Sequence, residues 1–261
     1  MIKRIATAII GIPLLIFMLI MGDIYLFLPI LIISLIGLYE FYSALEGKGY
    51  KPFFYLGYMF TFTILSGFYY KSTLPYFLIN IVLLIMLLSF IQLKKHKYSI
   101  VDCALTTYGI LYIPLLLGHI ILTAALPKRE CVWLIFIVAW STDTFAYFGG
   151  LIFGSKKLCP KISPKKTIAG AIWGVIGSVV ACGLFASIYF NDYIILFMSF
   201  GLLSSILSQL GDLTASQIKR HVEIKDFGHI FPGHGGVLDR FDSILFTAPA
   251  VYYFFILLIN L

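Results

Sequence analysis

Charged residues are scarce in this chain of 261 residues: 12% are Asp, Glu, Lys or Arg, whereas 61% are hydrophobic. Soluble domains carry about 25% charged residues, so the chain has too little charge to cover a water-facing surface. Its apolar residues also form runs of about 20, the length at which a helix crosses a bilayer. The scarcity of charge therefore excludes an ordinary soluble protein and predicts a polytopic membrane protein.

Cysteine is scarce too, and the four cysteines form neither a CxxC pair nor a Cys–His group. This scatter favours buried small apolar residues over a metal site. The net charge of +7 would suggest nucleic acid in a soluble protein. Here the cations lie in short segments between apolar runs, so membrane topology explains them better and no nucleic-acid partner is expected.

The apolar runs predict an all-α fold with about nine transmembrane helices, forming one integral-membrane domain over residues 1–261. The first run lacks a small-residue cleavage site, so we interpret it as an uncleaved span. We see no internal repeat. The predicted spans are residues 5–22, 24–42, 52–70, 75–93, 101–126, 131–152, 170–190, 193–210 and 243–261.

Lys and Arg residues predict the orientation of these spans. With the N-terminus in the cytoplasm, every cation falls in a cytoplasmic segment except Lys71, Lys128 and Arg129, as the positive-inside rule expects. Two cytoplasmic loops, 153–169 and 211–242, are longer than a connection requires. Residues 131–261 would then form the catalytic half, preceded by N-terminal helices over 1–130.

The loop 211–242 concentrates the chemistry, because five of the 12 acidic residues and three of the five histidines lie in it. A solvated loop can be rich in charge, but this one also holds a glycine-rich stretch at 228–236. Glycines let the backbone approach a phosphate closely. Neighbouring carboxylates suit Mg²⁺, which takes oxygen ligands and bridges to phosphates. Lys and Arg neutralise the remaining charge.

Two further features lie upstream. Asp143 falls inside the sixth apolar run, where a carboxylate is costly and usually faces a functional cavity; an interfacial, solvated Asp is the alternative. Residues 163–167, Ser-Pro-Lys-Lys-Thr, open the seventh span, so first-turn N–H groups with Lys165 and Lys166 would make an anion site. Ordinary positive-inside charge is the alternative there. Together these features predict metal-assisted phosphoryl or nucleotidyl transfer at the membrane surface.

The segment from Ser216 to Asp242 resembles the signature of the phosphatidate cytidylyltransferases, also called CDP-diacylglycerol synthases. The match runs through Ser-Gln-Ile-Lys-Arg at 216–220, Lys-Asp-Phe-Gly at 225–228 and Pro-Gly-His-Gly-Gly-Val-Leu-Asp-Arg-Phe-Asp at 232–242. Residues 143–149 and 163–167 also look like family blocks. One departure is Ala169, where the family often has Glu.

The resemblance implies that CTP and phosphatidate react, with Mg²⁺, to give CDP-diacylglycerol and pyrophosphate. It implies Asp212 and Asp239 as the principal metal ligands, with Asp242 and Asp143 as weaker candidates. Ser216, one turn beyond Asp212, would face the same site. His234 is a candidate acid for the departing pyrophosphate, and orienting a backbone turn is the alternative. The remaining phosphate-binding candidates are Lys165, Lys166, Lys219, Arg220, Lys225, Arg240, Gly235 and Gly236.

Other functions remain open at this stage. A CTP-dependent lipid kinase, acting on polyprenol or phytol, is the nearest alternative, and a secondary transporter is a distant one. The expected location is a bacterial inner membrane, with the lipid bilayer as partner. The sequence leaves open the acyl-chain preference, CTP versus dCTP, the number of metals, and the oligomeric state, with a homodimer among the alternatives.

Overall fold

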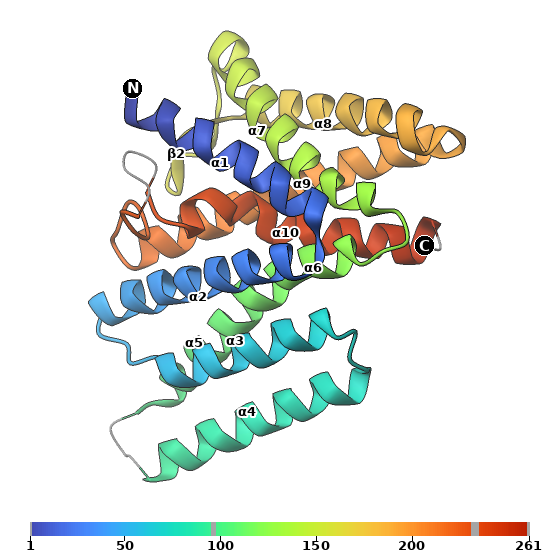
Figure 1. Ribbon diagram of the computed structural model, residues 1–261. Coiled ribbons are helices and arrows are strands. Elements are labelled where there is room, and N and C mark those ends of the chain that lie inside the picture. The colour runs from blue at the N-terminus through green and yellow to red at the C-terminus, as the bar shows by residue number, and fades with distance from the viewer. Residues whose placement is uncertain (1, 95–97, 231–234, 260–261) are drawn as a thin grey trace. The chain divides into compact units, whose positions relative to one another are not determined.

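The computed structural model describes residues 2–94, 98–230 and 235–259, and its architecture is almost entirely helical (Figure 1). The chain divides into two compact units. The first contains Met1–Ala125 and His221–Arg240, and the second contains Leu126–Arg220 and Phe241–Leu261. The described residues of the glycine-rich stretch, 228–230 and 235–236, therefore belong to the same unit as the N-terminal helices.

The first unit is a bundle of apolar helices. Its helix α3 packs against α2, α4 and α5, and Figure 1 shows α4 at the edge of this bundle. Leu38, Tyr42 and Leu65 are fully buried between these helices. Pro114 lies in a π-helical turn, because proline cannot donate a helical backbone hydrogen bond. The elements are α1 (Ile2–Met21), α2 (Asp23–Gly47), α3 (Phe54–Tyr69), α4 (Leu74–Lys94), α5 (Ile100–Ile110), η1 (Leu111–Leu115) and α6 (Leu116–Ala124).

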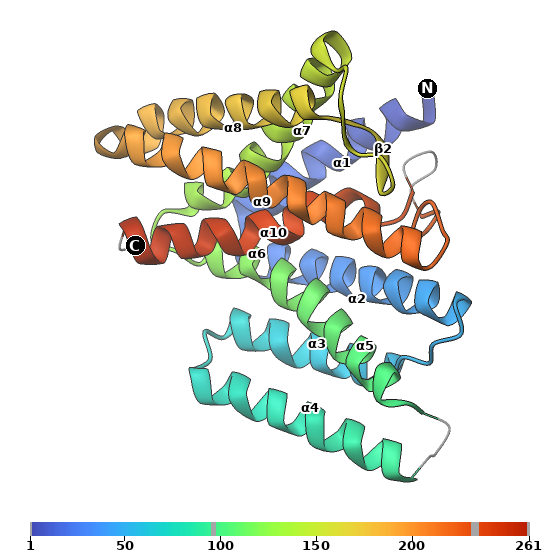
Figure 2. The ribbon, with the colours of Figure 1, turned by 180° about the vertical axis from the view of Figure 1, so that it is seen from behind.

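The second unit combines long helices with a short hairpin. Glycines bring its helices together: Gly174 lies against the Thr142 carbonyl oxygen of α7, and Gly201 of α9 lies against the Ser178 carbonyl oxygen of α8. Figure 2 shows α8 and α9 running alongside each other. The elements are η2 (Arg129–Val132), α7 (Trp133–Phe153), β1 (Lys157–Cys159), β2 (Ser163–Thr167), α8 (Ile168–Tyr189), η3 (Asn191–Tyr193), α9 (Ile194–His221), α10 (Leu238–Phe254) and η4 (Phe255–Ile259); α10 begins in the first unit.

The predicted membrane architecture is confirmed. Within the described residues, a helical segment occupies each of the nine predicted spans, with α5, η1 and α6 together forming the fifth. Among the described residues, seven segments are long and apolar enough to cross a membrane; α1 and α3 are not among the seven, and α3 has only 16 residues. The chain is a multi-pass membrane protein.

Both long loops are more structured than the sequence predicts. The second is shorter than 211–242, because α9 continues to His221 and α10 begins at Leu238. The first contains an antiparallel hairpin that pairs Lys157 with Thr167. Residues 163–167 are therefore a strand, and the prediction that they open a helix is wrong. Helix α8 begins at Ile168, where the Thr167 hydroxyl accepts a hydrogen bond from the Gly170 N–H (3.1 Å).

Candidate active site

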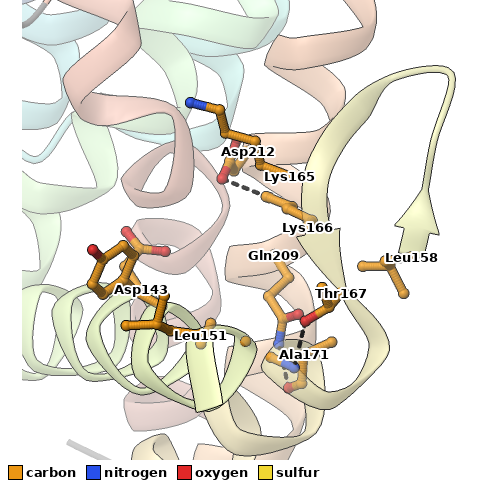
Figure 3. Close-up of a pocket in the computed structure, with 13 residues that line it drawn as sticks. Asp143, Leu151, Leu158, Lys165, Lys166, Thr167, Ala171, Gln209 and Asp212 are labelled. Carbon is orange, nitrogen blue, oxygen red and sulfur yellow. Dashed lines mark hydrogen bonds and ion pairs between the residues drawn. The ribbon is translucent and has the colours of Figure 1, made fainter. Parts of the chain in front are cut away.

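A cavity of about 410 Å³ opens in the second unit and is lined by α7, the hairpin, α8 and α9 (Figure 3). We call it the polar cavity, because two cations and two carboxylates meet in it. The four charged residues are Asp143 of α7, Lys165 and Lys166 of β2, and Asp212 of α9. The cavity thus brings together charged residues from three separate parts of the sequence.

Asp212 and Lys166 form an ion pair across the polar cavity, which Figure 3 marks with a dashed line. The Ser216 hydroxyl donates to the same carboxylate (3.3 Å), so Ser216 faces the site one turn beyond Asp212, as predicted. Both partners of the ion pair are only partly exposed. The neighbouring Lys165 is exposed. The pair therefore holds one strand lysine against α9, while the other remains accessible to an anion.

A second acidic position lies one turn into α10. Asp242 interacts electrostatically with Asp212, with the buried Lys219 and with Asp143. The Ser243 hydroxyl next to it donates to the Asp143 carboxylate (3.5 Å). Three carboxylates from three helices thus gather near one lysine. Because like charges repel, such a group favours an additional cation.

The donor set of this cluster fits Mg²⁺, because its ligands would all be carboxylate and hydroxyl oxygens. Nevertheless, no three His, Cys, Asp or Glu side chains among the described residues are already arranged to hold a metal. Asp212 instead pairs with Lys166, and one Asp242 oxygen accepts the Ser243 N–H (2.8 Å). A divalent cation would therefore replace a lysine ammonium as the counter-ion of Asp212.

Arg220 ties the end of α9 to the hairpin, since its Nε donates to the Ile162 carbonyl oxygen in the hairpin turn (3.2 Å). This contact orients the strand that carries Lys165 and Lys166. The sequence predicts a direct phosphate contact for Arg220. Its exposed guanidinium group has further N–H donors, so both roles are compatible.

The first unit holds the remaining predicted residues, in and next to the signature loop (residues 222–237, described at 222–230 and 235–237). The buried Asp239 accepts hydrogen bonds from the N–H groups of Phe227 (2.8 Å) and Gly236 (2.9 Å) with one oxygen, Oδ2. Lys225 and Arg240 are exposed. His234 lies outside the described residues. Because Asp212 and Asp239 belong to different units, their joint metal binding stays a prediction.

Glu223 is the second residue of this loop and pairs with Lys48, which follows α2. The hydrogen bond and charge of the Lys48 ammonium lower the pKa of the Glu223 carboxyl below its usual value. Exposed ion pairs of this kind add little to the stability of the fold. The contact therefore connects the start of the loop to the end of α2 but stabilises it only weakly.

Sequence reasoning missed Glu40, a buried carboxylate of α2 that accepts hydrogen bonds from the N–H groups of Val237 and Leu238 (both 2.9 Å). The signal was present, because Glu40 is a charged residue inside the predicted span 24–42, as Asp143 is inside its own.

Comparisons with known proteins identify the family of this chain. A model of the cytidylyltransferase family matches residues 2–258. Proteins named phosphatidate cytidylyltransferase are similar to this chain: 41% identity over 165 residues in Staphylococcus haemolyticus, 37% over 173 in Bacillus subtilis and 45% over 138 in Rickettsia felis. These stretches cover 63%, 65% and 50% of this chain and 63%, 64% and 60% of the respective relatives, less than two thirds of each relative's length.

Proposed function

This chain belongs to the cytidylyltransferase family, and from that membership we propose that it transfers CMP from CTP to phosphatidate, giving CDP-diacylglycerol and pyrophosphate. The single observation that supports this best is the polar cavity. There two lysines and two aspartates from three parts of the sequence line one cavity of a membrane protein. The similar proteins carry the name of this activity.

The proposed reaction needs charge and positioning more than proton transfer. The second pKa of a phosphomonoester is about 6, so the lipid phosphate is largely a dianion at pH 7. One of its oxygens attacks the α-phosphorus of CTP. The bond from that phosphorus to the oxygen bridging to the β-phosphorus then breaks, and pyrophosphate leaves with the electron pair. The barrier comes from bringing a dianion to a polyanion, which fixed cations offset.

We assign the residues by the charge that they offer. Lys165 and Lys166 would bind and orient phosphate oxygens from the hairpin, and Lys219 and Arg220 would do so from α9. Asp212, Asp242 and Asp143 of the second unit and Asp239 of the first are the candidate ligands of Mg²⁺. When bound, Mg²⁺ would neutralise phosphate charge and align the reacting groups.

We also propose that the N-terminus, the hairpin and the signature loop face the cytoplasm from a bacterial inner membrane. The distribution of Lys and Arg supports this orientation. The site would then bind CTP from the cytoplasm.

Pyrophosphate release by purified protein tests the proposed function. With CTP and Mg²⁺ present, pyrophosphate release should begin only when phosphatidate is added, and undecaprenol should yield neither pyrophosphate nor CDP. No pyrophosphate with phosphatidate, or CDP released with undecaprenol as a lipid kinase would release it, would contradict the proposal.

Lys166→Met tests whether the hairpin binds phosphate. Loss of a charge-assisted contact costs about 2 kcal/mol, so kcat/KM should fall roughly 30-fold. Most of this change should appear as a higher KM for CTP or phosphatidate. Lys156→Met is the matched control, because Lys156 is an exposed lysine just before β1. If both substitutions lowered kcat/KM equally, Lys166 would contribute only general positive charge and no specific phosphate contact.

An apolar groove of about 320 Å³ between α8 and α9 is the proposed place for one acyl chain. It shares Leu158, Ala171 and Gln209 with the polar cavity, so a lipid phosphate in the cavity would place a chain in the groove. Gln209 marks the boundary, since its amide donates to the Ala171 carbonyl oxygen (3.2 Å). This arrangement supports lateral entry of the lipid from the bilayer.

Val175→Trp fills this groove and should discriminate between substrates by chain length. We expect kcat/KM for dipalmitoyl phosphatidate to fall about tenfold, in line with overpacking costs of 1–3 kcal/mol, while dihexanoyl phosphatidate reacts nearly as before. Val180→Trp is the control, because Val180 lies further along α8 and is 49% exposed. Equal losses with both lipids would show that the groove holds no chain. Equally good reaction of a phosphomonoester without chains would also contradict lipid entry.

A further inference from the structure

Glu40 lies inside the first unit, close to the end of α2, and only 3% of it is exposed. A buried carboxylate is costly unless hydrogen bonds or opposite charges compensate it. Because Glu40 is separated from the signature loop by nearly 200 residues in sequence, its contacts there are tertiary and do not belong to an ordinary helix cap.

Both oxygens of Glu40 are used at the start of α10. Oε1 accepts the Val237 N–H and Oε2 accepts the Leu238 N–H, each at 2.9 Å. N–H groups at the beginning of a helix have no partner within the helix and carry partial positive charge. A carboxylate from another helix therefore fixes both the position and the direction of the α10 N-terminus.

Two glycines of the signature loop shape the space for this carboxylate. A Cβ atom added at Gly228 or at Gly236 would overlap the Glu40 carboxyl group. The φ angle of Gly236 lies outside the left-handed region, unlike that of Gly235 (82°). Gly236 is thus required for close approach to Glu40 and not for its backbone conformation.

Asp239 holds the same loop from the other side. It accepts the N–H groups of Phe227 and Gly236. Together, Glu40 and Asp239 therefore accept hydrogen bonds from Phe227 and from the three consecutive N–H groups of residues 236–238. Displacing Glu40 would move Gly236 and the first turn of α10, and with them the Asp239 carboxylate.

We propose that Glu40 is a positioning residue that sets the signature loop and the orientation of Asp239 for the reaction. The inference rests on the proposed function for its kinetic consequence, but its structural part does not. Glu40 touches no substrate in this account and acts through the backbone of residues 236–238. If Glu40 only stabilised the bundle, its substitution would lower the amount of folded protein. The hydrogen exchange of the loop and its metal dependence would not change.

Glu40→Gln tests the structural part in metal-free protein. The glutamine can accept one of the two N–H groups, but its own NH₂ then faces the other donor. Amide hydrogen exchange of peptides covering 235–240 should become at least about tenfold faster, since about 1.4 kcal/mol of local protection is a factor of ten. Peptides from α4 should be unchanged. Glu46→Gln, on an exposed position of α2, is the control and should exchange as the wild type.

The same variant tests the kinetic part. Residues that orient a metal ligand typically change affinity or activity about 10- to 100-fold, so we expect the Mg²⁺ concentration for half-maximal activity to rise by about that factor. A loss of folded protein alone would lower the maximal rate and leave this midpoint in place. An unchanged midpoint with unchanged hydrogen exchange would overturn the proposal.

Gly236→Ala provides an independent test by a double-mutant cycle. In the wild-type background the added methyl overlaps the Glu40 carboxyl group, and kcat/KM should fall about tenfold or more. In a Glu40→Ala background that space is empty, so the same substitution should cost less than about threefold, a coupling within the range for contacting residues. Equal losses in both backgrounds would show that Gly236 acts on substrate independently of Glu40.

Failure of the proposed function can be distinguished from failure of this inference. If wild-type protein made no CDP-diacylglycerol while Glu40→Gln still loosened residues 235–240, the assigned reaction would be wrong and the positioning contact would stand. If wild-type protein were active and Glu40→Gln changed neither hydrogen exchange nor the Mg²⁺ midpoint, the positioning role would be wrong.

Discussion

Asp212→Asn is expected to lower kcat on the order of 10³-fold, with the protein still inserted in the membrane and purified in normal amount. The carboxamide keeps an oxygen that can accept the Ser216 hydroxyl, but it loses the charge that pairs with Lys166. Asparagine is also a poorer ligand for Mg²⁺. The magnitude is the upper end of what one lost electrostatic contact costs in an active site.

The matched control for this substitution is Asp192→Asn, because Asp192 is an exposed acid just before the other end of α9. We expect it to have wild-type kinetics. Activity should be measured as pyrophosphate release at saturating CTP and phosphatidate. If Asp212→Asn kept more than about a tenth of the wild-type rate, Asp212 would be a partner of Lys166 only and would leave the proposed ligand set.

Asp239→Asn is expected to lower kcat on the order of 10³-fold for a related reason. A single oxygen of Asp239 accepts both loop N–H groups, and the amide oxygen of asparagine can accept the same two. The loop should therefore keep its conformation while the negative charge is lost. Unchanged hydrogen exchange over residues 235–240 would show that the loop is intact, and a rate lowered on the order of 10³-fold would assign the effect to charge.

Asp226→Asn is the control for this second substitution, since Asp226 is an exposed acid of the same loop. It should react as the wild type. Near-normal activity of Asp239→Asn would restrict Asp239 to organising the loop, and Asp212, Asp242 and Asp143 would then remain as candidate ligands.

Hydropathy alone predicts most of the fold, because backbone groups in a bilayer must be satisfied within helices. It fails at the polar connections between spans, because hydropathy carries no information on the structure of polar segments. Residues 157–167 form a hairpin there, and Asp212 to Arg220 extend α9 beyond its apolar part. The first charged residues predict where such a helix leaves the apolar layer of the membrane. They do not predict where the helix itself ends.

The candidate site was predictable where its residues form compact sequence blocks. Asp143 and Lys166 lie in two blocks that carry the resemblance, Asp212 lies just before the third, and all three residues line one cavity. Glu40 belongs to no such block. Its role depends on hydrogen bonds to the backbone of residues 237 and 238, and backbone donors carry no signal in a sequence.

The fate of the two ends of CTP tests the central claim most directly. Purified protein would be supplied with phosphatidate, Mg²⁺ and CTP labelled with ³²P at either the α- or the γ-phosphate, and the products separated by organic extraction and thin-layer chromatography. The account predicts that the α-label enters the lipid as CDP-diacylglycerol and that the γ-label leaves as pyrophosphate. A γ-label in the lipid with CDP left free would identify a lipid kinase and contradict the account, as would the absence of label from the lipid in both cases.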